Sequence, residues 1–509
     1  MSDGEPRRVS GREGADAVSR LAVRSPVDGR TVGSVAATPP SRVEDLVARG
    51  RAAQPGWSAV GFDARARRLL DLRAWIVRER GRLIRTMCDE GGKTYEDALL
   101  EVVVLCQAIG FWARRAERYL RPRRSWARQP LLAGRRLEVR YVPRGVVGVI
   151  APWNYPLVLG LGDALPALMA GNATVIKPSD ETPLSTALIV EEGFRAAGIP
   201  PDVCLVAQGG AEVGRAVVDA VDMIMFTGST PVGREVAERA GRRLIPASVE
   251  LGGKDPMIVL ADADLERAAN CAVYYGMGNA GQTCQAVERV YVEAAVYDEF
   301  VRRVTDKAAR LRMGAPAGPG SVDIGPLARP GQREVVSEHV RAAVAAGART
   351  PVGGDADGSF HAPTVILDPD PSASCMRDET FGPVLPIVKV RDAEEAIALA
   401  NDSRYGLNSS VFTRDVRRGE AIARRIEAGA SCINDACANF LEIGAPFGGW
   451  KDSGLGGRNG AEGIRKYCRQ QTILTARVGL RRDPNMFPYR ARVTRLLERA
   501  LTIAYGRRS

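Results

Sequence analysis

The chain is poor in histidine, and this scarcity restricts the chemistry open to it. His339 and His361 are its only two histidines in 509 residues. A zinc site built on histidine is therefore disfavoured, and we predict no metal site. A Ser-His-Asp triad would need one of these two residues, and neither adjoins the G-x-S-x-G turn that presents a nucleophilic serine.

Paired cysteines and long apolar runs are also missing. The nine cysteines are scattered without a C-x-x-C pair, which favours a reducing compartment over a disulfide framework. The first twenty residues are polar and lack the apolar core of a secretory signal. The longest uncharged stretches, 268–287 and 145–162, contain Asn, Gly or Pro, so we interpret them as buried elements and not membrane spans. A cytoplasmic protein is expected.

Lysine is scarce although the chain is basic. The net charge is +11, but only seven of the 71 basic residues are Lys, and the arginines are spread along the whole chain. No basic groove with interleaved aromatic residues is present, so we expect no nucleic-acid partner. A hydrophobic content of 45% and a charged content of 26% are typical of a globular protein.

Short apolar strands alternate with helices from residue 142 onward. This pattern predicts a doubly wound parallel sheet. The expected strands are 146–150, 173–176, 203–206 and 223–226, with helices at 183–197, 211–219 and 231–240. A second α/β series follows residue 253, with strands near 257–260, 290–292, 383–390, 409–412 and 430–433. Two long helices, 63–80 and 94–119, precede the first sheet, and 121–140 reads as a hairpin.

Cys284 and Glu250 are the candidate nucleophile and base. Cys284 ends the run Gly281-Gln282-Thr283-Cys284, where a thiolate could be activated by backbone amides. Glu250 follows an apolar strand and precedes two glycines, which places it at the carboxyl end of a strand beside a ligand crevice. Taken singly, each has a plainer interpretation, as a small buried hydrophobe and as a solvated strand-end charge. Together they suit the formation and hydrolysis of a thioester.

A turn after the fourth strand has the composition of a phosphate site. In 228–233, Gly228 allows a tight turn, Ser229 can cap the next helix and Gly233 permits close packing. The free N–H groups of that helix would face a pyrophosphate. The G-x-x-x-x-G spacing is weak evidence alone. The other predicted cofactor-binding residues are Trp153, Lys177, Asp180, Leu251, Glu379 and Phe381.

Asn154 stands between two prolines in Pro152-Trp153-Asn154-Tyr155-Pro156. Its amide could donate to an oxyanion, although a simple turn Asn is the plainer interpretation. Selectivity for the substrate is expected from the residues around the nucleophile. The predicted pocket consists of Tyr155, Thr283, Gln285, Phe447 and the loop 435–445.

The order of these motifs resembles the aldehyde dehydrogenase superfamily from about residue 25 to 472. The resemblance rests on runs that begin at Pro152, Ile176, Phe226, Glu250, Gly281, Glu379 and Pro446. It implies that Cys284 attacks an aldehyde and that Asn154 and the Cys284 N–H hold the oxyanion. A nicotinamide cofactor would accept the hydride, and Glu250 would activate water to release a carboxylic acid.

The resemblance also implies a domain organisation. The expected parts are an N-terminal tail (1–24), a dinucleotide-binding domain (25–121 and 142–252), a catalytic domain (253–452), a small β oligomerisation element (122–141 and 466–480) and a basic C-terminal extension (481–509). Members of the superfamily form homodimers or homotetramers, so the same is expected here.

Two departures from the family pattern bear on specificity. Asp180 stands where the family often has Glu, which bonds the ribose 2′-OH and repels a 2′-phosphate. Asp is a shorter carboxylate, so NAD is the preferred cofactor but NADP stays open. The loop 435–445 lacks Arg and Lys, which argues against a carboxylate-bearing substrate such as succinate semialdehyde, although the general sequence resembles such enzymes. A CoA-acylating dehydrogenase is the alternative activity, and Glu250 counts against it because a base that directs water would waste the acyl group.

The C-terminal extension contains a basic amphipathic helix. Apolar residues on one face are flanked by arginines, which suits either an anionic membrane surface or docking on the protein's own subunit. Docking is the favoured interpretation. The residues are Val493, Leu496, Leu497, Ala500 and Ala504, with Arg490, Arg492, Arg495 and Arg499 nearby.

Overall fold

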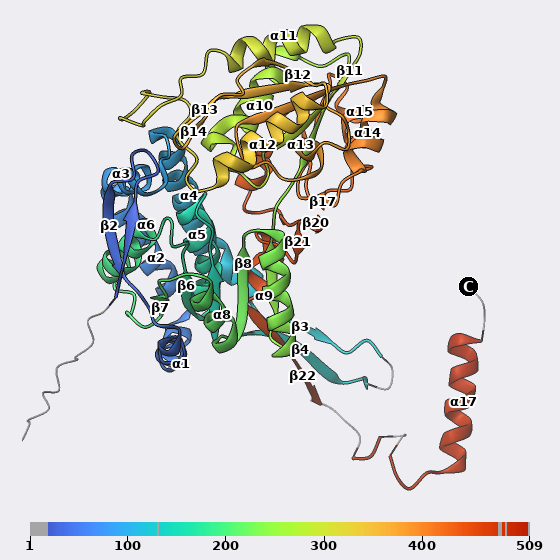
Figure 1. The fold of residues 1–509 in the computed structure, drawn as a ribbon. Coiled ribbons are helices and arrows are strands. Elements are labelled where there is room, and N and C mark those ends of the chain that lie inside the picture. The colour runs from blue at the N-terminus through green and yellow to red at the C-terminus, as the bar shows by residue number, and fades with distance from the viewer. Residues whose placement is uncertain (1–18, 130–131, 477–480, 484–485, 507–509) are drawn as a thin grey trace, which may run out of the picture. The chain divides into compact units, whose positions relative to one another are not determined.

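The computed structural model describes residues 19–129, 132–476, 481–483 and 486–506 (Figure 1). The chain divides into two compact units, of which the larger comprises Met1–Tyr119 and Pro143–Tyr467. The smaller comprises Leu120–Val142 and Cys468–Ser509. Among the described residues, we find no helix with the length and apolar composition needed to cross a membrane.

A six-stranded sheet in the order β21-β9-β8-β5-β6-β7 organises the first half of the larger unit. Its strands are β5 (Val146–Ile150), β6 (Ala173–Lys177), β7 (Cys204–Val206), β8 (Met223–Thr227), β9 (Ala247–Glu250) and β21 (Gly454–Leu455). All neighbours except β21 and β9 run parallel. The predicted doubly wound sheet is confirmed. The chain winds outward from β5 to β7 and returns at β8, so the switch point lies between β5 and β8, where ligand crevices form.

Helices cover this sheet. They are α5 (Pro156–Met169), α6 (Leu184–Leu188), a π-helical segment (Ile189–Gly193), α7 (Phe194–Ala196), α8 (Ala211–Ala220) and α9 (Thr230–Arg242). The predicted helix 183–197 thus begins at Leu184 and contains a π turn. Glu90, from another helix, accepts hydrogen bonds from the Leu184 and Ser185 amides at 2.6 and 3.1 Å, so a distant carboxylate caps it.

The segment before the sheet is mainly helical, as predicted. A hairpin of β1 (Arg20–Arg24) and β2 (Thr31–Ala36) precedes α1 (Val43–Ala59), α2 (Gly61–Arg78), α3 (Arg80–Gly91) and α4 (Tyr95–Leu120). Helix α4 is important for the site because its Glu101 reaches the first turn of α5. One carboxylate oxygen of Glu101 accepts the Leu157 and Val158 amides at 3.1 and 3.2 Å.

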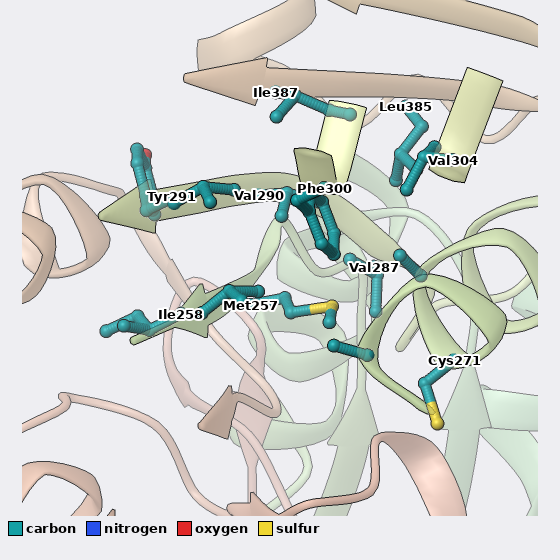
Figure 2. Close-up of a cluster of buried hydrophobic side chains, with 14 of the residues drawn as sticks. Met257, Ile258, Cys271, Val287, Val290, Tyr291, Phe300, Val304, Leu385 and Ile387 are labelled. Atoms are coloured by element: carbon teal, nitrogen blue, oxygen red, sulfur yellow. The ribbon is translucent and has the colours of Figure 1, made fainter. Parts of the chain in front are cut away.

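A seven-stranded sheet in the order β12-β15-β16-β11-β10-β18-β19 forms the second half. Its strands are β10 (Asp255–Val259), β11 (Val287–Glu293), β12 (Arg349–Val352), β15 (Thr364–Leu367), β16 (Val384–Val390), β18 (Ser410–Phe412) and β19 (Cys432–Ile433). The predicted second series missed β12 and β15. Figure 2 shows part of the hydrophobic core around this seven-stranded sheet, in which Met257, Val290 and Phe300 pack together. Each of these three residues is fully buried.

Helices and short elements complete this half. They are α10 (Leu265–Met277), α11 (Tyr297–Ala308), α12 (Gln332–Ala345), α13 (Ser374–Arg377), α14 (Ala393–Asn401), α15 (Val416–Ala423), α16 (Gly460–Arg465), β13 (Ala356–Asp357), β14 (Phe360–His361), β17 (Tyr405–Gly406) and β20 (Trp450–Lys451).

The smaller unit contains a three-stranded sheet and the last helix. The strands are β3 (Arg123–Trp126), β4 (Arg135–Pro143) and β22 (Cys468–Ala476), in the order β22-β4-β3. An ion pair joins Arg135 to Asp483. Helix α17 (Ala491–Tyr505) has no buried residue.

Candidate active site

The Cys284 turn has a backbone that few residues could adopt. Asn279 and Ala280 have φ values of 54° and 55°, in the left-handed region, and Gly281 follows at 71°. A Cβ on Gly281 would lie 2.0 Å from the Gly382 carbonyl oxygen. Only glycine fits there, because the turn is pressed against the segment before β16. Such strain persists where surrounding structure enforces it, and it is frequent at functional sites.

Asn154 lies directly against the Cys284 turn. Its side-chain amide donates to the Gln282 carbonyl at 2.9 Å, and the Asn279 amide donates to the Asn154 carbonyl at 3.2 Å. The loop after β5 and the turn before β11 are therefore locked together. A primary amide has two N–H donors, so Asn154 retains one for another acceptor.

The Cys284 thiol is protonated in this environment. Removal from water raises its pKa to about 12. The Arg458 guanidinium lowers that pKa, whereas the carboxylates of Glu379, Asp255 and Glu250 raise it further. The thiol therefore needs a base, or an additional positive charge, before it can act as a nucleophile.

Glu250 is a buried carboxylate with an unused oxygen. It ends β9, where it pairs with Thr227 of β8 and with Gly454 of β21. The residue is 3% exposed, and its Oε1 has no hydrogen-bond partner within the described part of the chain. Burial raises its pKa, while Arg458 and Lys466 lower it. A buried, unpartnered carboxylate with a raised pKa is typical of a general base.

Two cations and a second carboxylate surround Glu250, and the sequence analysis missed all three. Arg458 donates from Nη2 to Asp163 at 3.0 Å and to the Thr227 hydroxyl at 2.8 Å. Lys466 donates to the Gly457 carbonyl at 2.7 Å, and burial lowers its pKa to about 8. Asp163 could have been recognised in the sequence, because it is the single charged residue in the otherwise apolar helix α5.

Two predicted cofactor residues meet at the carboxyl end of β6. Lys177 is buried, and its Nζ donates to the Pro178 carbonyl at 3.0 Å. Burial lowers its pKa, and Asp180 opposes that change. A Cβ on Gly210, the residue before α8, would lie 3.7 Å from an Asp180 carboxylate oxygen. These side chains therefore share one edge of the sheet.

The predicted phosphate turn opens α9, with Ser229 as its N-cap. Its side chain forms no capping hydrogen bond, contrary to the sequence prediction. The amides of the first turn are consequently left without a side-chain acceptor. Gly233 faces Leu251, because a Cβ there would lie 2.2 Å from a Leu251 methyl group. At Gly228, a Cβ would lie 2.6 Å from the Phe226 ring.

Glu379 and Phe381 reach the same region from the second sheet. Glu379 accepts the Gly253 amide at 3.1 Å, and burial together with Glu288 raises its pKa to about 8. Phe381 has a φ of 51° and packs edge-on against Trp153, with ring centroids 5.4 Å apart.

The conformation of this segment depends on Glu288 in β11. Glu288 accepts the Thr380 and Phe381 amides at 2.9 and 3.0 Å and pairs with buried Lys254 at 2.5 Å. Sequence reasoning missed Glu288 and the role of Lys254, which become evident only once the two segments are folded together.

A cavity of about 190 Å³ leads to Cys284. Tyr155, Thr283 and Gln285 line it as predicted, and Tyr155 and Thr283 share a hydrogen bond of 2.9 Å. The remaining wall is mostly apolar or aromatic, including Leu100, Val104, Val158, Tyr274, Phe440 and Leu441. Within the described chain, the charged residues of the lining are both acidic, Asp97 and Glu101.

Phe447 does not line this cavity, contrary to the sequence prediction. Its backbone pairs with Arg458, and its ring packs edge-on against Phe440 at a centroid distance of 5.3 Å. Phe440 therefore forms the wall and Phe447 supports it from behind. The residues that α4 contributes, Asp97, Leu100, Glu101 and Val104, were missed although their spacing places them on one helical face.

A lysine that contacts the cavity wall, Lys93, is neutralised. Lys93 lies 3.3 Å from Glu101, donates to the Asn279 side chain at 2.9 Å and lies over the Tyr155 ring at 4.2 Å. Because the side chains of Lys93 and Glu101 are 4% and 0% exposed, water does not screen this pair. The cavity thus offers no free positive charge from Lys93.

Comparisons with known proteins agree with this arrangement. A model of the aldehyde dehydrogenase family matches residues 13–473. A Mycolicibacterium smegmatis protein provisionally named succinate-semialdehyde dehydrogenase (NADP+) is 41% identical over 479 residues, which cover 93% of this chain and 92% of that protein. The 4,4'-diapolycopene aldehyde oxidase of a Methylomonas species is 37% identical over 495 residues, which cover 96% and 92%.

Solved structures give the same result. The Mycobacterium tuberculosis aldehyde dehydrogenase complexed with NAD+ has a TM-score of 0.85 and 35% identity, covering 89% of this chain and 94% of that one. The lactaldehyde dehydrogenase of Escherichia coli has a TM-score of 0.85 and 32% identity, covering 90% and 96%.

Proposed function

The chain belongs to the aldehyde dehydrogenase family, and we propose that it oxidises an uncharged, apolar aldehyde to a carboxylic acid with NAD or NADP. The observation that carries the proposal is the convergence of Cys284, Asn154 and Glu250 from three separate segments. The Cys284 turn is hydrogen-bonded to the Asn154 loop, and Glu250 contributes to the pKa of the Cys284 thiol.

The chemistry of the chain's own residues follows from these positions. The Cys284 thiol loses its proton to water, Sγ bonds to the aldehyde carbon, and Asn154 with the Cys284 N–H stabilises the resulting oxyanion. After loss of hydride, the carbon is held as a thioester. Glu250 removes a proton from water, which attacks the thioester, breaks the C–S bond and releases the acid.

The predicted cofactor residues fit a nicotinamide dinucleotide. The uncapped first turn of α9 suits a pyrophosphate, and Lys177 with Asp180 suits the adenosine ribose. At the nicotinamide end of the cofactor, Glu379, which accepts the Gly253 amide, suits the ribose, and Phe381 suits the nicotinamide ring. Trp153 packs against Phe381, and Leu251 lies against Gly233 in α9. The bound cofactor supplies the hydride acceptor. NAD is preferred because Asp180 would repel a 2′-phosphate, and NADP remains the alternative.

The cavity supports an apolar aldehyde over succinate semialdehyde. A substrate carboxylate entering this cavity would meet Asp97, while Lys93 and Glu101 are already paired with each other. An uncompensated like charge in a partly dry site is unfavourable. The loop 435–445 contributes Phe440 and Leu441 to the wall, which agrees with its lack of basic residues. Succinate semialdehyde remains the alternative substrate because of the names of the relatives.

The experiment pairs a substrate screen with a test of the base. Hexanal, benzaldehyde and succinate semialdehyde are each supplied with NAD and with NADP, and reduced cofactor is measured by absorbance. We expect kcat/KM to be higher for the two apolar aldehydes. Cys284→Ala should abolish turnover, whereas Cys88→Ala, which alters another partly exposed cysteine, should not. Equal or higher kcat/KM for succinate semialdehyde would refute the substrate assignment.

Glu250→Gln distinguishes hydrolysis from acyl transfer to coenzyme A. We expect a burst of one reduced cofactor per site followed by turnover slowed roughly 10²–10⁴-fold, because the thioester persists without its base. If the wild-type enzyme forms acyl-CoA, and forms acid only slowly, the CoA-acylating alternative is correct.

The remaining proposals concern organisation. Residues 25–121 with 142–252 are proposed to bind the dinucleotide and 253–452 to carry the nucleophile. We propose that 122–141 with 466–480 pair subunits into a homodimer or homotetramer, and the three-stranded sheet offers β3 as an edge strand. Nine free cysteines support a cytoplasmic location. Mass photometry of the purified protein tests the assembly.

A further inference from the structure

Helix α17 has an apolar side that is exposed to solvent. Leu496, Leu501 and Ile503 are 66%, 61% and 81% exposed, and the helix has no buried residue. Apolar residues recur three or four positions apart, so they share one side of the helix. They are Val493, Leu496, Leu497, Ala500, Leu501, Ile503 and Ala504. This apolar side gains free energy from any partner that removes it from water.

The edge of that apolar side is strongly basic. Arg492, Arg495 and Arg499 lie along it, and Arg490 immediately precedes the helix. Glu498 is the one acidic residue of the helix. These four arginines form no ion pair with any residue that the structure describes. Their charge is therefore available to an anionic partner.

Exposed aromatic residues flank the helix at both ends. Phe487 and Tyr489 are 76% and 71% exposed, with ring centroids 4.6 Å apart, and Tyr505 is 71% exposed. Aromatic rings of this kind, above all those with a polar end, favour the boundary between lipid headgroups and acyl chains.

We propose that residues 486–505 dock on an anionic membrane surface, with α17 lying in the plane of the interface. The 15-residue helix is about 22 Å long, shorter than the roughly 30 Å hydrocarbon core, so it lies on the bilayer and does not span it. Charge complementarity favours lipid over a second copy of this helix, because two apolar sides in contact would bring their arginine edges together. A cytoplasmic leaflet supplies the required anionic lipid.

The proposal goes beyond aldehyde oxidation and is independent of it. Helix α17 contributes no residue to the cavity at Cys284. An apolar aldehyde partitions into bilayers, so a docked enzyme would meet its substrate at the membrane surface.

Vesicle flotation of the full-length protein tests the proposal. The vesicles are pure phosphatidylcholine, or about three parts phosphatidylcholine to one part phosphatidylglycerol. We expect flotation with the anionic vesicles alone and its loss in high salt. Changing Arg492, Arg495 or Arg499 singly to Gln should lower the partition coefficient roughly fivefold each. Failure to float with anionic vesicles would overturn the proposal.

A pair of acid substitutions separates the helix from other exposed apolar residues. Leu496→Glu with Leu501→Glu should abolish flotation and leave turnover of a water-soluble aldehyde unchanged. The matched control is Leu244→Glu, which alters a leucine that is 92% exposed outside this helix and should float like the wild type. Undiminished flotation of the double variant would show that the helix does not dock on membranes. A fall in the assembly mass of the double variant without lipid would show that the helix joins copies of the chain.

Discussion

Glu288 is predicted to position the Phe381 segment, and Glu288→Gln tests this. The two carboxylate oxygens bond separate amides: Oε2 accepts Thr380 N and Oε1 accepts Phe381 N. In Gln, one oxygen becomes an NH₂ group that faces an N–H donor, so at least one of these bonds is lost. Phe381 has a φ of 51°, a conformation that costs about 1–3 kcal/mol and persists only while it is held.

The expected changes in cofactor KM and in stability follow from the burial of Glu288. A hydrogen bond to a charged group contributes about 1.5–3 kcal/mol, which corresponds to a rise of about 10- to 100-fold in KM for the cofactor. The same substitution leaves buried Lys254 without its counter-ion, which should lower the free energy of unfolding by about 3–5 kcal/mol. Steady-state kinetics with NAD and NADP and urea unfolding measure the two effects separately.

Two controls separate positioning from stability. Adding Lys254→Met to Glu288→Gln removes the unpaired cation, so stability should recover while the cofactor KM stays raised. Glu293→Gln alters another buried carboxylate of the same strand, which accepts the Ala261 amide at 2.6 Å, and it should lower stability without changing the cofactor KM. If Glu288→Gln folds with lowered stability and an unchanged KM for both cofactors, the positioning role is wrong.

Three further predictions follow from the packing and charge of the site. Gly233→Ala places a Cβ 2.2 Å from Leu251. This substitution should raise the cofactor KM and lower the free energy of unfolding by about 1–3 kcal/mol. Adding Leu251→Ala to it should relieve both effects, as measured by steady-state kinetics and urea unfolding. Lys466 has a folded-state pKa of about 8 against an ordinary 10.5, so the unfolded chain binds more protons between these values. The contribution of Lys466 to the free energy of unfolding should therefore rise with pH across this window, and the difference between the wild type and Lys466→Met in urea titrations at each pH measures it. Leu441→Arg adds a cation to the cavity wall and should raise kcat/KM for succinate semialdehyde about tenfold over that for hexanal, whereas no gain would contradict the charge argument.

The sequence predicted those parts of the fold that depend on local pattern. The strands β5, β6 and β8 are short apolar runs, and their burial on both faces makes them recognisable. Strands β12 and β15 were missed because no helix separates them in the chain and they pair antiparallel, so they do not fit the alternation of strand and helix. The cap of α6 was also beyond reach, because its acceptor, Glu90, lies 94 residues earlier in the chain.

The candidate site divides in the same way. Cys284 and Asn154 lie in turns, and Glu250 ends β9 just before two glycines, so these glycines and prolines mark their positions in the sequence, while their roles stay predictions. Phe447 was placed in the pocket by its motif alone, and only the pairing of its backbone with Arg458 shows that Phe440 stands in front of it. The direction in which a side chain points from its backbone depends on tertiary contacts, and a sequence motif does not contain them.

Substrate specificity in this family is therefore expected to depend on the walls of the cavity and not on the catalytic motifs. The motifs that support catalysis are compatible with relatives as different as a succinate-semialdehyde dehydrogenase by name and a diapolycopene aldehyde oxidase. Such substrates differ in charge and length, and the cavity wall that would meet them comes from α4 and from the segment around Phe440 and Leu441. In this chain Glu101 neutralises Lys93 and also binds the first amides of α5. The carboxylate that pairs with Lys93 is thus part of the framework that holds Asn154, so freeing Lys93 by changing Glu101 should disturb catalysis as well.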